Sequence, residues 1–292
     1  MNSTLKLKNV NKKYEKSNFA IKDISFSVPE GSIVGFIGEN GAGKSTTMNC
    51  ILNVIRRDSG TIEIFGREMT DEDIDIRENI GVIYDSNNFP EYLTARQLAD
   101  ILGRIYSKWD DFCFEQFLRR FGLPESQRIK TYSRGMSMKL AIAVALSHDS
   151  KLLILDEATS GLDPIMRDEI LDVLLEFVKQ ENHSILLSSH ITSDLEKIAD
   201  YIVFIHNGEI ILNKTKDELI YEYGVIRCSE NDFYNILPED ILSSMKKDYQ
   251  IDVLIKNRKL MEKKYKNLII DSVSLDEIML LLVKGERNAR ID

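Results

Sequence analysis

A glycine-rich segment at residues 38–46 constrains the fold of this chain more than any other feature. It reads Gly-Glu-Asn-Gly-Ala-Gly-Lys-Ser-Thr and fits the pattern Gly-x-x-x-x-Gly-Lys-[Ser/Thr]. The apolar run Ser32–Ile37 before it is typical of a buried strand, and Thr46–Val54 after it is predicted to be a helix. A strand, a glycine-rich turn and a helix in this order predict an α/β unit with a phosphate-binding loop.

The residue types in this loop suit phosphate chemistry. Gly38, Gly41 and Gly43 let the backbone curl so that its N–H groups converge on phosphate oxygens, and the following helix adds its dipole. Lys44 would neutralise the β- and γ-phosphates, and the hydroxyl of Ser45 would bind Mg²⁺. The competing interpretation is a glycine-rich turn that binds nothing.

Composition narrows the class of protein. The chain has 292 residues, 43% of them hydrophobic, and a net charge of −9, so we expect no nucleic-acid partner. Its three cysteines show no metal-ligand spacing and are predicted to be reduced thiols. We see no signal-peptide pattern and no apolar run long enough to span a bilayer. Any membrane connection is therefore expected through another chain.

Strands and helices alternate along most of the chain. Residues 4–30 are predicted to form short strands with turns, and later buried strands are predicted at Ile80–Tyr84, Lys151–Leu155, Ser184–Ser189 and Tyr201–Ile205. Helices are predicted at 94–122, broken near Trp109 with Asp110 or Asp111 as the second cap, and from Pro164 to about Gln180. This alternation predicts a parallel sheet covered on both faces.

The last part of the chain differs from the rest. Residues 215–292 are richer in charge and have shorter periodic segments, which predicts a small appended α/β domain. Ser274–Val283 is predicted to be an amphipathic helix capped by Ser274.

Two adjacent carboxylates follow a predicted strand. Asp156 and Glu157 end the run Leu152–Leu155, at the edge where ligands bind in parallel sheets. Asp156 suits a Mg²⁺ contact, and Glu157 could polarise an attacking water. The alternative is a surface pair that starts a loop.

With these residues in place, the chain resembles the ATP-binding subunit of an ABC transporter over residues 4–213. The phosphate loop and Leu-Leu-Ile-Leu-Asp-Glu match its two nucleotide motifs. Residues 132–136 (Tyr-Ser-Arg-Gly-Met) resemble the family signature, and residues 160–163 (Ser-Gly-Leu-Asp) match the loop after the acidic pair. His190 matches the switch histidine, and Tyr14 matches the aromatic residue that stacks on adenine. The signature variant and the added C-terminal region look most like the ABC-2 type exporter branch.

The resemblance implies a fold and a division of the chain. It implies a P-loop NTPase cassette of the α/β class, with an N-terminal antiparallel β subdomain and a helical subdomain at about residues 86–150. The nucleotide-binding domain is expected at residues 1–214 and a small C-terminal accessory domain at residues 215–292.

The resemblance also implies an activity and partners. The expected function is a bacterial ATPase subunit that uses ATP and Mg²⁺ to drive drug, antibiotic-peptide or ion export. Two cassettes, identical or different, would close head to tail on two MgATP. They would act through a separate transmembrane permease, on the cytoplasmic side of the cell membrane.

The family motifs imply which residues of this chain form the site. The expected catalytic residues are Lys44, Glu157 and His190, and the expected metal ligands are Ser45, Asp85 and Asp156. The expected nucleotide-binding residues are Tyr14, Gly38, Glu39, Asn40, Gly41, Ala42, Gly43, Lys44, Ser45, Thr46, Ser133, Gly135 and Asp163.

Some of these residues have simpler interpretations. Ser133 or Asp163 could be plain helix caps, His190 could be structural, and Tyr14 could pack in the small sheet. In the family roles, Ser133 and Gly135 would contact the γ-phosphate bound by the partner cassette.

Two residues depart from the family pattern. Asp85 stands where most members have glutamine, and Arg134 stands where the signature has glycine. Asp85 could still sense the metal with altered geometry. Arg134 could strengthen a closed dimer through the γ-phosphate, or it could point to solvent.

Two further hypotheses concern partners. The segment Asn87–Trp109, which carries Phe89, Tyr92 and Leu93, could receive the membrane subunit, or these side chains could pack internally. The alternative functions are a soluble ABC ATPase acting on nucleic acid or ribosomes, and a regulatory switch that barely hydrolyses ATP.

Overall fold

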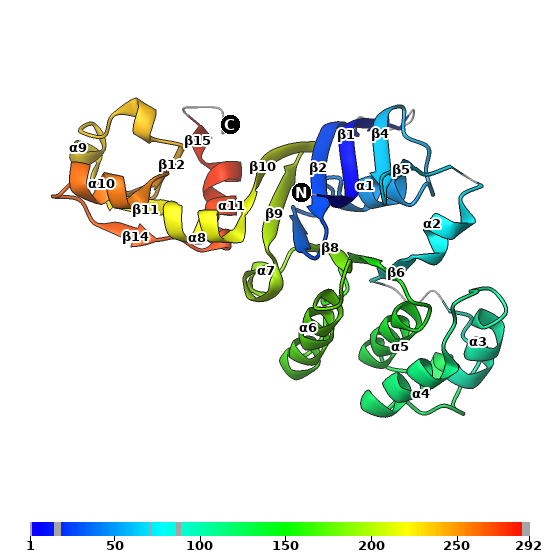
Figure 1. Cartoon of the computed structure of the whole chain (residues 1–292). Helices are drawn as coiled ribbons and strands as arrows, with labels where there is room; N and C mark the ends of the chain where they lie inside the picture. Colours follow the sequence, from blue (N-terminus) through cyan, green and yellow to red (C-terminus); the bar gives the residue numbers. More distant parts are fainter. Residues whose placement is uncertain (1, 15–18, 71, 86–88, 288–292) are drawn as a thin grey trace.

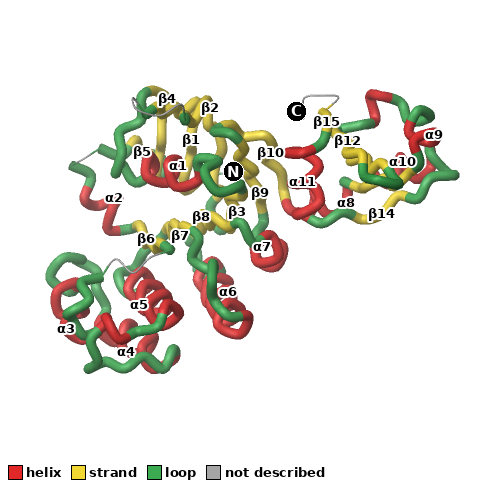
Figure 2. The backbone as a smooth tube through the Cα atoms, turned by 180° about the vertical axis from the view of Figure 1, so that it is seen from behind, coloured by secondary structure: helices red, strands yellow, loops and turns green. Residues whose placement is uncertain are grey.

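The computed structural model describes residues 2–14, 19–70, 72–85 and 89–287. Three sheets organise these residues (Figure 1): a mixed six-stranded sheet, an antiparallel four-stranded sheet beside it, and a five-stranded sheet near the C-terminus. Figure 2 shows from behind that helices α3, α4 and α5 lie at one end of the molecule and the C-terminal sheet at the other.

The six-stranded sheet carries the strands that the sequence predicts to be buried. Its order is β10-β9-β3-β8-β7-β6, and all neighbours run parallel except β10, which pairs antiparallel with β9. Its strands are β3 (Ile33–Ile37), β6 (Ile80–Tyr84), β7 (Leu152–Asp156), β8 (Ser184–Ser189), β9 (Tyr201–His206) and β10 (Glu209–Thr215). Every residue of β3 and β8 is buried, as expected for a parallel sheet covered on both faces.

The N-terminal strands form an antiparallel sheet beside this one. Its order is β2-β1-β4-β5, with β1 (Ser3–Lys13), β2 (Ala20–Pro29), β4 (Ser59–Ile64) and β5 (Arg67–Glu68). A buried hydrogen bond between the hydroxyls of Thr4 and Ser184, 2.8 Å long, joins β1 to β8. Apolar side chains from β1, β2, β3 and α1 (Lys44–Ile51) share one core between the two sheets.

The helix after the glycine-rich loop differs from its prediction. The sequence predicts Thr46–Val54, whereas α1 begins at Lys44 and ends at Ile51. Asn53 adopts a left-handed backbone with φ of 54°, a conformation typical of the residue after a helix end. The start is earlier because Gly43, with φ of 117°, leads directly into the first helical turn.

Helices lie on both sides of β6 in the sequence. α2 (Ile74–Glu78) precedes the strand, and α3 (Ala95–Leu102), α4 (Asp111–Arg120), the 3₁₀ turn η1 (Ile129–Thr131) and α5 (Arg134–Leu146) follow it. The predicted break near Trp109 is confirmed, and Asp110 caps α4 by accepting a 2.9 Å hydrogen bond from the Cys113 N–H. α4 and α5 pack against each other, and α5 packs against β6.

The C-terminal part forms an antiparallel sheet with its own helices. The strand order is β14-β11-β13-β12-β15, from β11 (Gly224–Cys228), β12 (Ser243–Lys246), β13 (Ile251–Ile255), β14 (Ile270–Ser272) and β15 (Glu286–Arg287). Its helices are α8 (Lys216–Glu222), α9 (Glu230–Phe233), η2 (Pro238–Asp240), α10 (Arg258–Lys264) and α11 (Leu275–Lys284). The predicted cap of α11 is confirmed, because Ser274 and Glu277 form a capping box.

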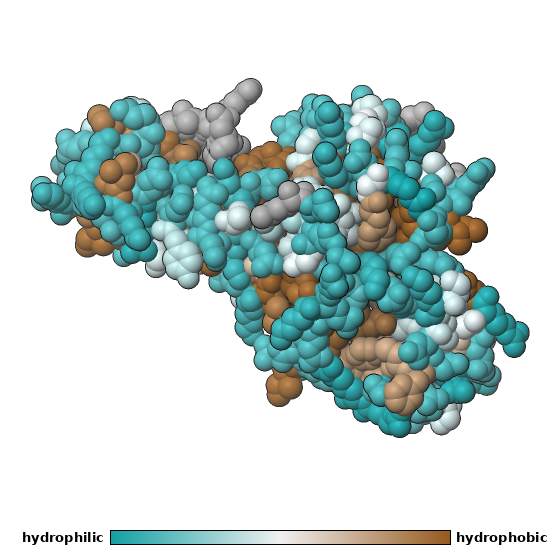
Figure 3. All heavy atoms as spheres, in the orientation of Figure 1, coloured by the Kyte–Doolittle hydropathy of each residue, from teal (hydrophilic) through white to brown (hydrophobic). Residues whose placement is uncertain are grey.

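The surface is mostly hydrophilic on the face shown in Figure 3, with hydrophobic residues in separate patches. Among the described residues, no helix combines the length and the apolar composition needed to cross a bilayer.

Candidate functional site

The glycine-rich loop lies between β3 and α1 and is held tightly against neighbouring strands. A Cβ atom on Gly38 would stand 2.6 Å from the carbonyl oxygen of Ile205, and one on Gly43 would stand 2.7 Å from Cγ2 of Ile21. Side chains are therefore excluded at both positions by close approach to β9 and β2. The loop backbone, and not its side chains, occupies this space.

The N-terminus of α1 faces the same site. The first backbone hydrogen bond of this helix, from residue i to residue i−4, runs from the Thr47 N–H to the Gly43 carbonyl at 2.9 Å. The N–H groups of the preceding three residues are left unpaired by the helix itself, as at every helix start. Such groups suit phosphate oxygens, and the helix dipole adds to this attraction.

Three residues predicted to be catalytic lie in direct contact. Nζ of Lys44 is 3.1 Å from Oε1 of Glu157, and Nδ1 of His190 is 2.5 Å from the other carboxylate oxygen, Oε2. Lys44 and Glu157 are largely buried, whereas the His190 side chain is 47% exposed. Nζ of Lys44 also donates a 2.6 Å hydrogen bond to the carbonyl of Gly38. The arrangement joins a cation, a carboxylate and an imidazole at the end of the sheet.

A serine on β8 fixes the acidic pair. The hydroxyl of Ser188 donates a 2.6 Å hydrogen bond to Oδ1 of Asp156 and accepts a 3.0 Å hydrogen bond from the Glu157 N–H. Glu157 has a φ of 54°, which non-glycine residues seldom adopt. This backbone turns the Glu157 side chain towards Lys44 and His190. The sequence predicts the strand that holds Ser188 but gives no signal for its role.

A pocket of about 420 Å³ opens beside the loop. Most of its lining residues are predicted nucleotide ligands, and the full set is Phe19, Glu39, Asn40, Gly41, Gly43, Lys44, Ser45, Thr46 and Glu157. Phe19 was not predicted, although its aromatic character and its place five positions after Tyr14 were visible in the sequence. Tyr14 is 37% exposed, and its hydroxyl lies 3.5 Å from that of Thr46. The loop thus has aromatic side chains next to its polar groups.

The donors around this pocket fit a nucleotide triphosphate with Mg²⁺. Lys44, the α1 N-terminus and the loop backbone supply positive groups for phosphates. In the described ranges, no cluster of three or more His, Cys, Asp or Glu side chains could hold a metal alone. Mg²⁺ sites of one or two carboxylates completed by phosphates and waters do not need such a cluster.

Asp85 does not line this pocket. It forms an ion pair and hydrogen bond with Arg134, and both side chains are about half exposed. Together they border a separate pocket of about 440 Å³ between the end of β6 and the helices around α5. The structure therefore pairs the two residues that depart from the family pattern. The role of Asp85 as a metal ligand stays a prediction.

The remaining predicted residues are helix caps and close packing contacts within this chain. Ser133 caps α5 by accepting from the Met136 N–H at 3.2 Å. Asp163 caps α6 (Pro164–Val178) by accepting from the N–H groups of Ile165 and Met166. Gly135 is buried so close to Met166 that a Cβ would stand 1.9 Å from its sulfur. Ala42 is also buried, and its carbonyl accepts from the Gly208 N–H.

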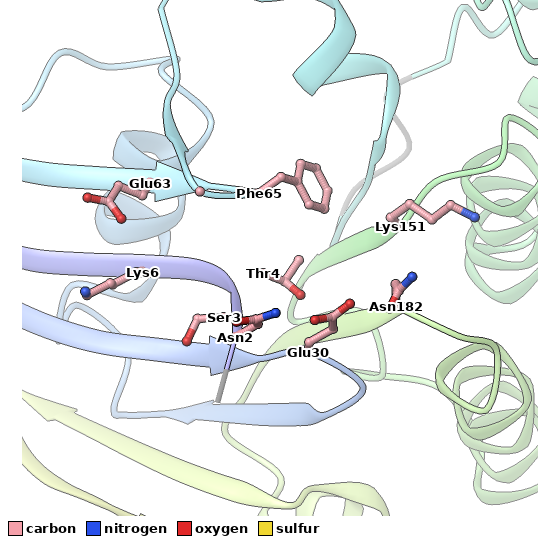
Figure 4. A pocket seen from close by; sticks show the side chains of 10 residues that line it. Asn2, Ser3, Thr4, Lys6, Glu30, Glu63, Phe65, Lys151 and Asn182 are labelled. Atoms are coloured by element: carbon pink, nitrogen blue, oxygen red, sulfur yellow. The ribbon is translucent and has the colours of Figure 1, made fainter.

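A larger pocket, of about 590 Å³, lies elsewhere (Figure 4). Its lining includes Thr4 and Glu63 from the antiparallel sheet, and Lys151 and Asn182 just before strands β7 and β8. These two residues precede their strands, whereas the phosphate loop and the acidic pair lie at the carboxyl ends of theirs. The two pockets are therefore at opposite ends of the parallel strands.

Comparison with known proteins agrees with this geometry. The family model described as "ABC transporter" matches residues 21–160. The bacitracin transport ATP-binding protein BcrA of Bacillus licheniformis is 36% identical over 213 residues, which cover 72% of this chain and 69% of that protein. The lantibiotic transport ATP-binding protein SrtF of Streptococcus pyogenes is 36% identical over 219 residues, covering 73% and 91%.

Solved structures show the same fold. CbiO1 from Clostridium perfringens, part of the ABC transporter complex cbiONQ, superposes with a TM-score of 0.65 at 25% identity. The match covers 75% of this chain and 91% of that one. The relatives do not favour the alternative of a soluble ATPase acting on nucleic acid or ribosomes. This chain belongs to the ABC transporter ATP-binding protein family, whose members hydrolyse ATP to drive transport.

Proposed function

We propose that this chain binds MgATP at the phosphate loop and hydrolyses it as half of a head-to-tail cassette dimer that drives export through a separate membrane subunit. The observation that carries the proposal is the contact of Lys44 and His190 with the two carboxylate oxygens of Glu157. These groups stand beside a pocket lined by the loop, where a γ-phosphate would need a cation and a base.

Each residue has a task in this proposal. The loop backbone and Lys44 bind the phosphates and stabilise the charge that develops on the transferred group. Glu157 orients or deprotonates the attacking water, and His190 contacts the γ-phosphate. Ser45 and Asp156 would hold Mg²⁺, which would supply further charge neutralisation. Asp85 would join the metal site only after Arg134 releases it.

Lys44 connects binding to hydrolysis. Its ammonium group contacts Glu157, and a triphosphate would compete for the same cation. Moving Lys44 to phosphate would free one carboxylate oxygen of Glu157 to accept a hydrogen bond from water. The base is therefore activated only when nucleotide is bound.

A dimer would complete the site. Ser133, Gly135 and Asp163 lie at the starts of α5 and α6 and would act on the nucleotide of the partner cassette. Capping does not prevent this, because the Ser133 hydroxyl that accepts from the Met136 N–H can still donate its own proton. Asp163 caps through Oδ1 alone, and other N–H groups at the helix starts stay available.

The nucleotide-binding domain would comprise residues 1–214, with its helical subdomain at about 86–150, and residues 215–292 the accessory domain. This division is supported by β10, the last strand of the six-stranded sheet, which ends at Thr215. The five-stranded sheet lies entirely after this point. Export of a drug, peptide antibiotic or ion from the cytoplasmic side of the membrane is part of this proposal, and it is supported by relatives named for the transport of bacitracin and lantibiotics.

The membrane subunit would dock at the segment Asn87–Trp109, which follows β6. Of the segment Asn87–Trp109, the first two residues lie outside the described ranges. Phe89, Leu93 and Trp109 pack against the core, which is the alternative that these side chains pack internally. Tyr92, by contrast, is 71% exposed and remains a candidate contact.

Replacing Tyr92 with Glu should abolish co-purification of the membrane subunit while ATP binding by the isolated chain is unchanged. Phe112 is 65% exposed on α4 and lies outside the segment Asn87–Trp109, so Phe112→Glu is the matched control. If both variants retain the complex, the docking site lies elsewhere.

The catalytic assignment is tested by Glu157→Gln. We expect ATP turnover to fall at least about a hundredfold because the general base is lost. The affinity for ATP should be kept, since the loop is intact. Retained turnover would remove Glu157 from this role.

Lys44→Ala should act differently. It removes the buried cation, so we expect nucleotide affinity itself to weaken by roughly ten- to hundredfold. Titration with a fluorescent ATP analogue measures this directly, and an unchanged affinity would contradict the assigned contact.

A further inference from the structure

Two ion pairs of different character join the helices α6 and α7 (Thr192–Ile198). Nε of Arg167 lies 3.9 Å from Oδ2 of Asp194, whose side chain is only 4% exposed. Nζ of Lys197 lies 2.6 Å from Oδ1 of Asp168, and both of these side chains are 59% exposed. The same two helices therefore carry one buried pair and one surface pair.

The buried pair is not fully closed. At 3.9 Å the two atoms are too far apart for a hydrogen bond, and neither atom has another hydrogen-bond partner among the described residues. A buried carboxylate oxygen without a hydrogen bond is unfavourable. A shift of about 1 Å between α6 and α7 would form a charge-assisted hydrogen bond. Slightly closer packing of α6 and α7 would therefore complete the pair.

Arg167 also reaches the loop before α6. Its Nη2 donates a 3.1 Å hydrogen bond to the carbonyl of Leu162, the residue before Asp163. On the other side, Asp194 stands four residues after His190, on the helix that this histidine precedes. His190 in turn contacts Glu157. One guanidinium therefore links the loop at residues 160–163 to the helix that follows His190.

We propose that Arg167 and Asp194 are positioning residues for ATP hydrolysis. Their pair sets the distance between α6 and α7, and so the placement of His190 and of the loop at residues 160–163 relative to Glu157. The surface pair of Lys197 and Asp168 joins the same helices but, within the described ranges, forms no hydrogen bond or ion pair with this loop. This inference rests on the roles proposed above for Glu157 and His190.

The main test is Asp194→Asn, which keeps the shape of the side chain and removes its charge. We expect kcat for ATP to fall by roughly tenfold or more, because small misplacements of catalytic groups are costly. KM for ATP should stay within about twofold, since no loop residue that binds phosphate changes. The melting temperature should be unchanged or higher, because an incompletely paired buried charge is removed. A merely structural role would lower it.

Asp168→Asn is the matched control. It removes the same charge from the surface pair on the same helices, and kcat should stay within about twofold of wild type. A double-mutant cycle adds Arg167→Met and the combination with Asp194→Asn. If the two residues act as one unit, the double variant should lose about tenfold in kcat and not about a hundredfold.

Three results would overturn this inference: wild-type kcat in Asp194→Asn, an equal loss in Asp168→Asn, or losses that multiply in the double variant. Failure of the proposed function would look different. In that case Glu157→Gln would retain turnover, whatever the Arg167 and Asp194 variants do.

Discussion

The hydroxyl of Ser188 holds both members of the acidic pair. It contacts the carboxylate of Asp156 and the backbone N–H of Glu157 at the same time. Glu157 needs this support because its φ of 54° costs free energy for a residue with a Cβ. The geometry of the proposed base thus depends on a side chain from the neighbouring strand.

Replacing Ser188 with Ala should lower kcat by about tenfold while KM for ATP changes little, because Glu157 loses its orientation. Ser184 on the same strand is the matched control, since its hydroxyl bonds to Thr4 at the other end of β8. Ser184→Ala should lower the melting temperature but leave kcat near wild type. Equal kcat in the two variants would contradict the positioning role of Ser188.

Sequence reasoning found the site residues that are contiguous in the chain. The phosphate loop, Asp156 and Glu157 follow buried strands, and that local pattern is visible in the sequence. Ser188, Arg167 and Asp194 gave no such signal, because their partners lie on other elements. The pairing of Asp85 with Arg134 likewise joins residues 49 positions apart.

At the scale of elements, α7 is held on two sides. α6 contacts it through the pairs described above, and α11 contacts it through Glu196. Oε1 of Glu196 accepts a 2.8 Å hydrogen bond from the N–H of Leu275, the first residue of α11. The carbonyl of Glu196 accepts from Nζ of Lys216 at 2.9 Å. The C-terminal part therefore meets the cassette at the helix that follows His190.

Glu196→Gln should destabilise this contact by about 1 kcal/mol, because a carboxylate at a helix N-terminus gains from the helix dipole and the charged hydrogen bond. Urea unfolding measures the change. Glu181 is exposed in the turn after α6 and, among the described residues, forms no hydrogen bond or ion pair with α11, so Glu181→Gln serves as the comparison. If the urea midpoints of Glu196→Gln and Glu181→Gln were equal, the proposed contribution of Glu196 to stability would be contradicted.

Helix ends show what local sequence can and cannot predict. Asp110 and Ser274 were found as caps because their hydrogen bonds stay within one turn. The ends of α1 were predicted wrongly, because the backbone conformations of Gly43 and Asn53 decide them. The pairing order of the strands was not predicted, since it depends on contacts between distant segments.

At the scale of the whole molecule, two buried histidines link stability to pH. His148 stacks on Tyr106, and His183 stacks on Phe177. Burial lowers the pKa of both imidazoles, and Lys151 lowers that of His183 further. In the unfolded chain these two imidazoles return to the ordinary histidine pKa of about 6.5, so they bind protons more readily than they do in the folded protein. The contribution of these two histidines to stability is complete above that pH and is lost as the pH falls below it.

The urea midpoint should therefore drop between about pH 7.5 and about pH 5.5. The double variant His148→Gln/His183→Gln should show a smaller drop over the same range, whatever its absolute stability. An identical drop in both proteins would assign the pH dependence to other groups.

In the proposed mechanism, two of these chains close over bound nucleotide and separate after hydrolysis. The most direct measurement is the mass in solution of Glu157→Gln, by light scattering, with saturating ATP and Mg²⁺. We expect a particle of twice the 33.5 kDa chain mass, which returns to one chain when nucleotide is removed. A particle of one chain mass at saturating MgATP would contradict it.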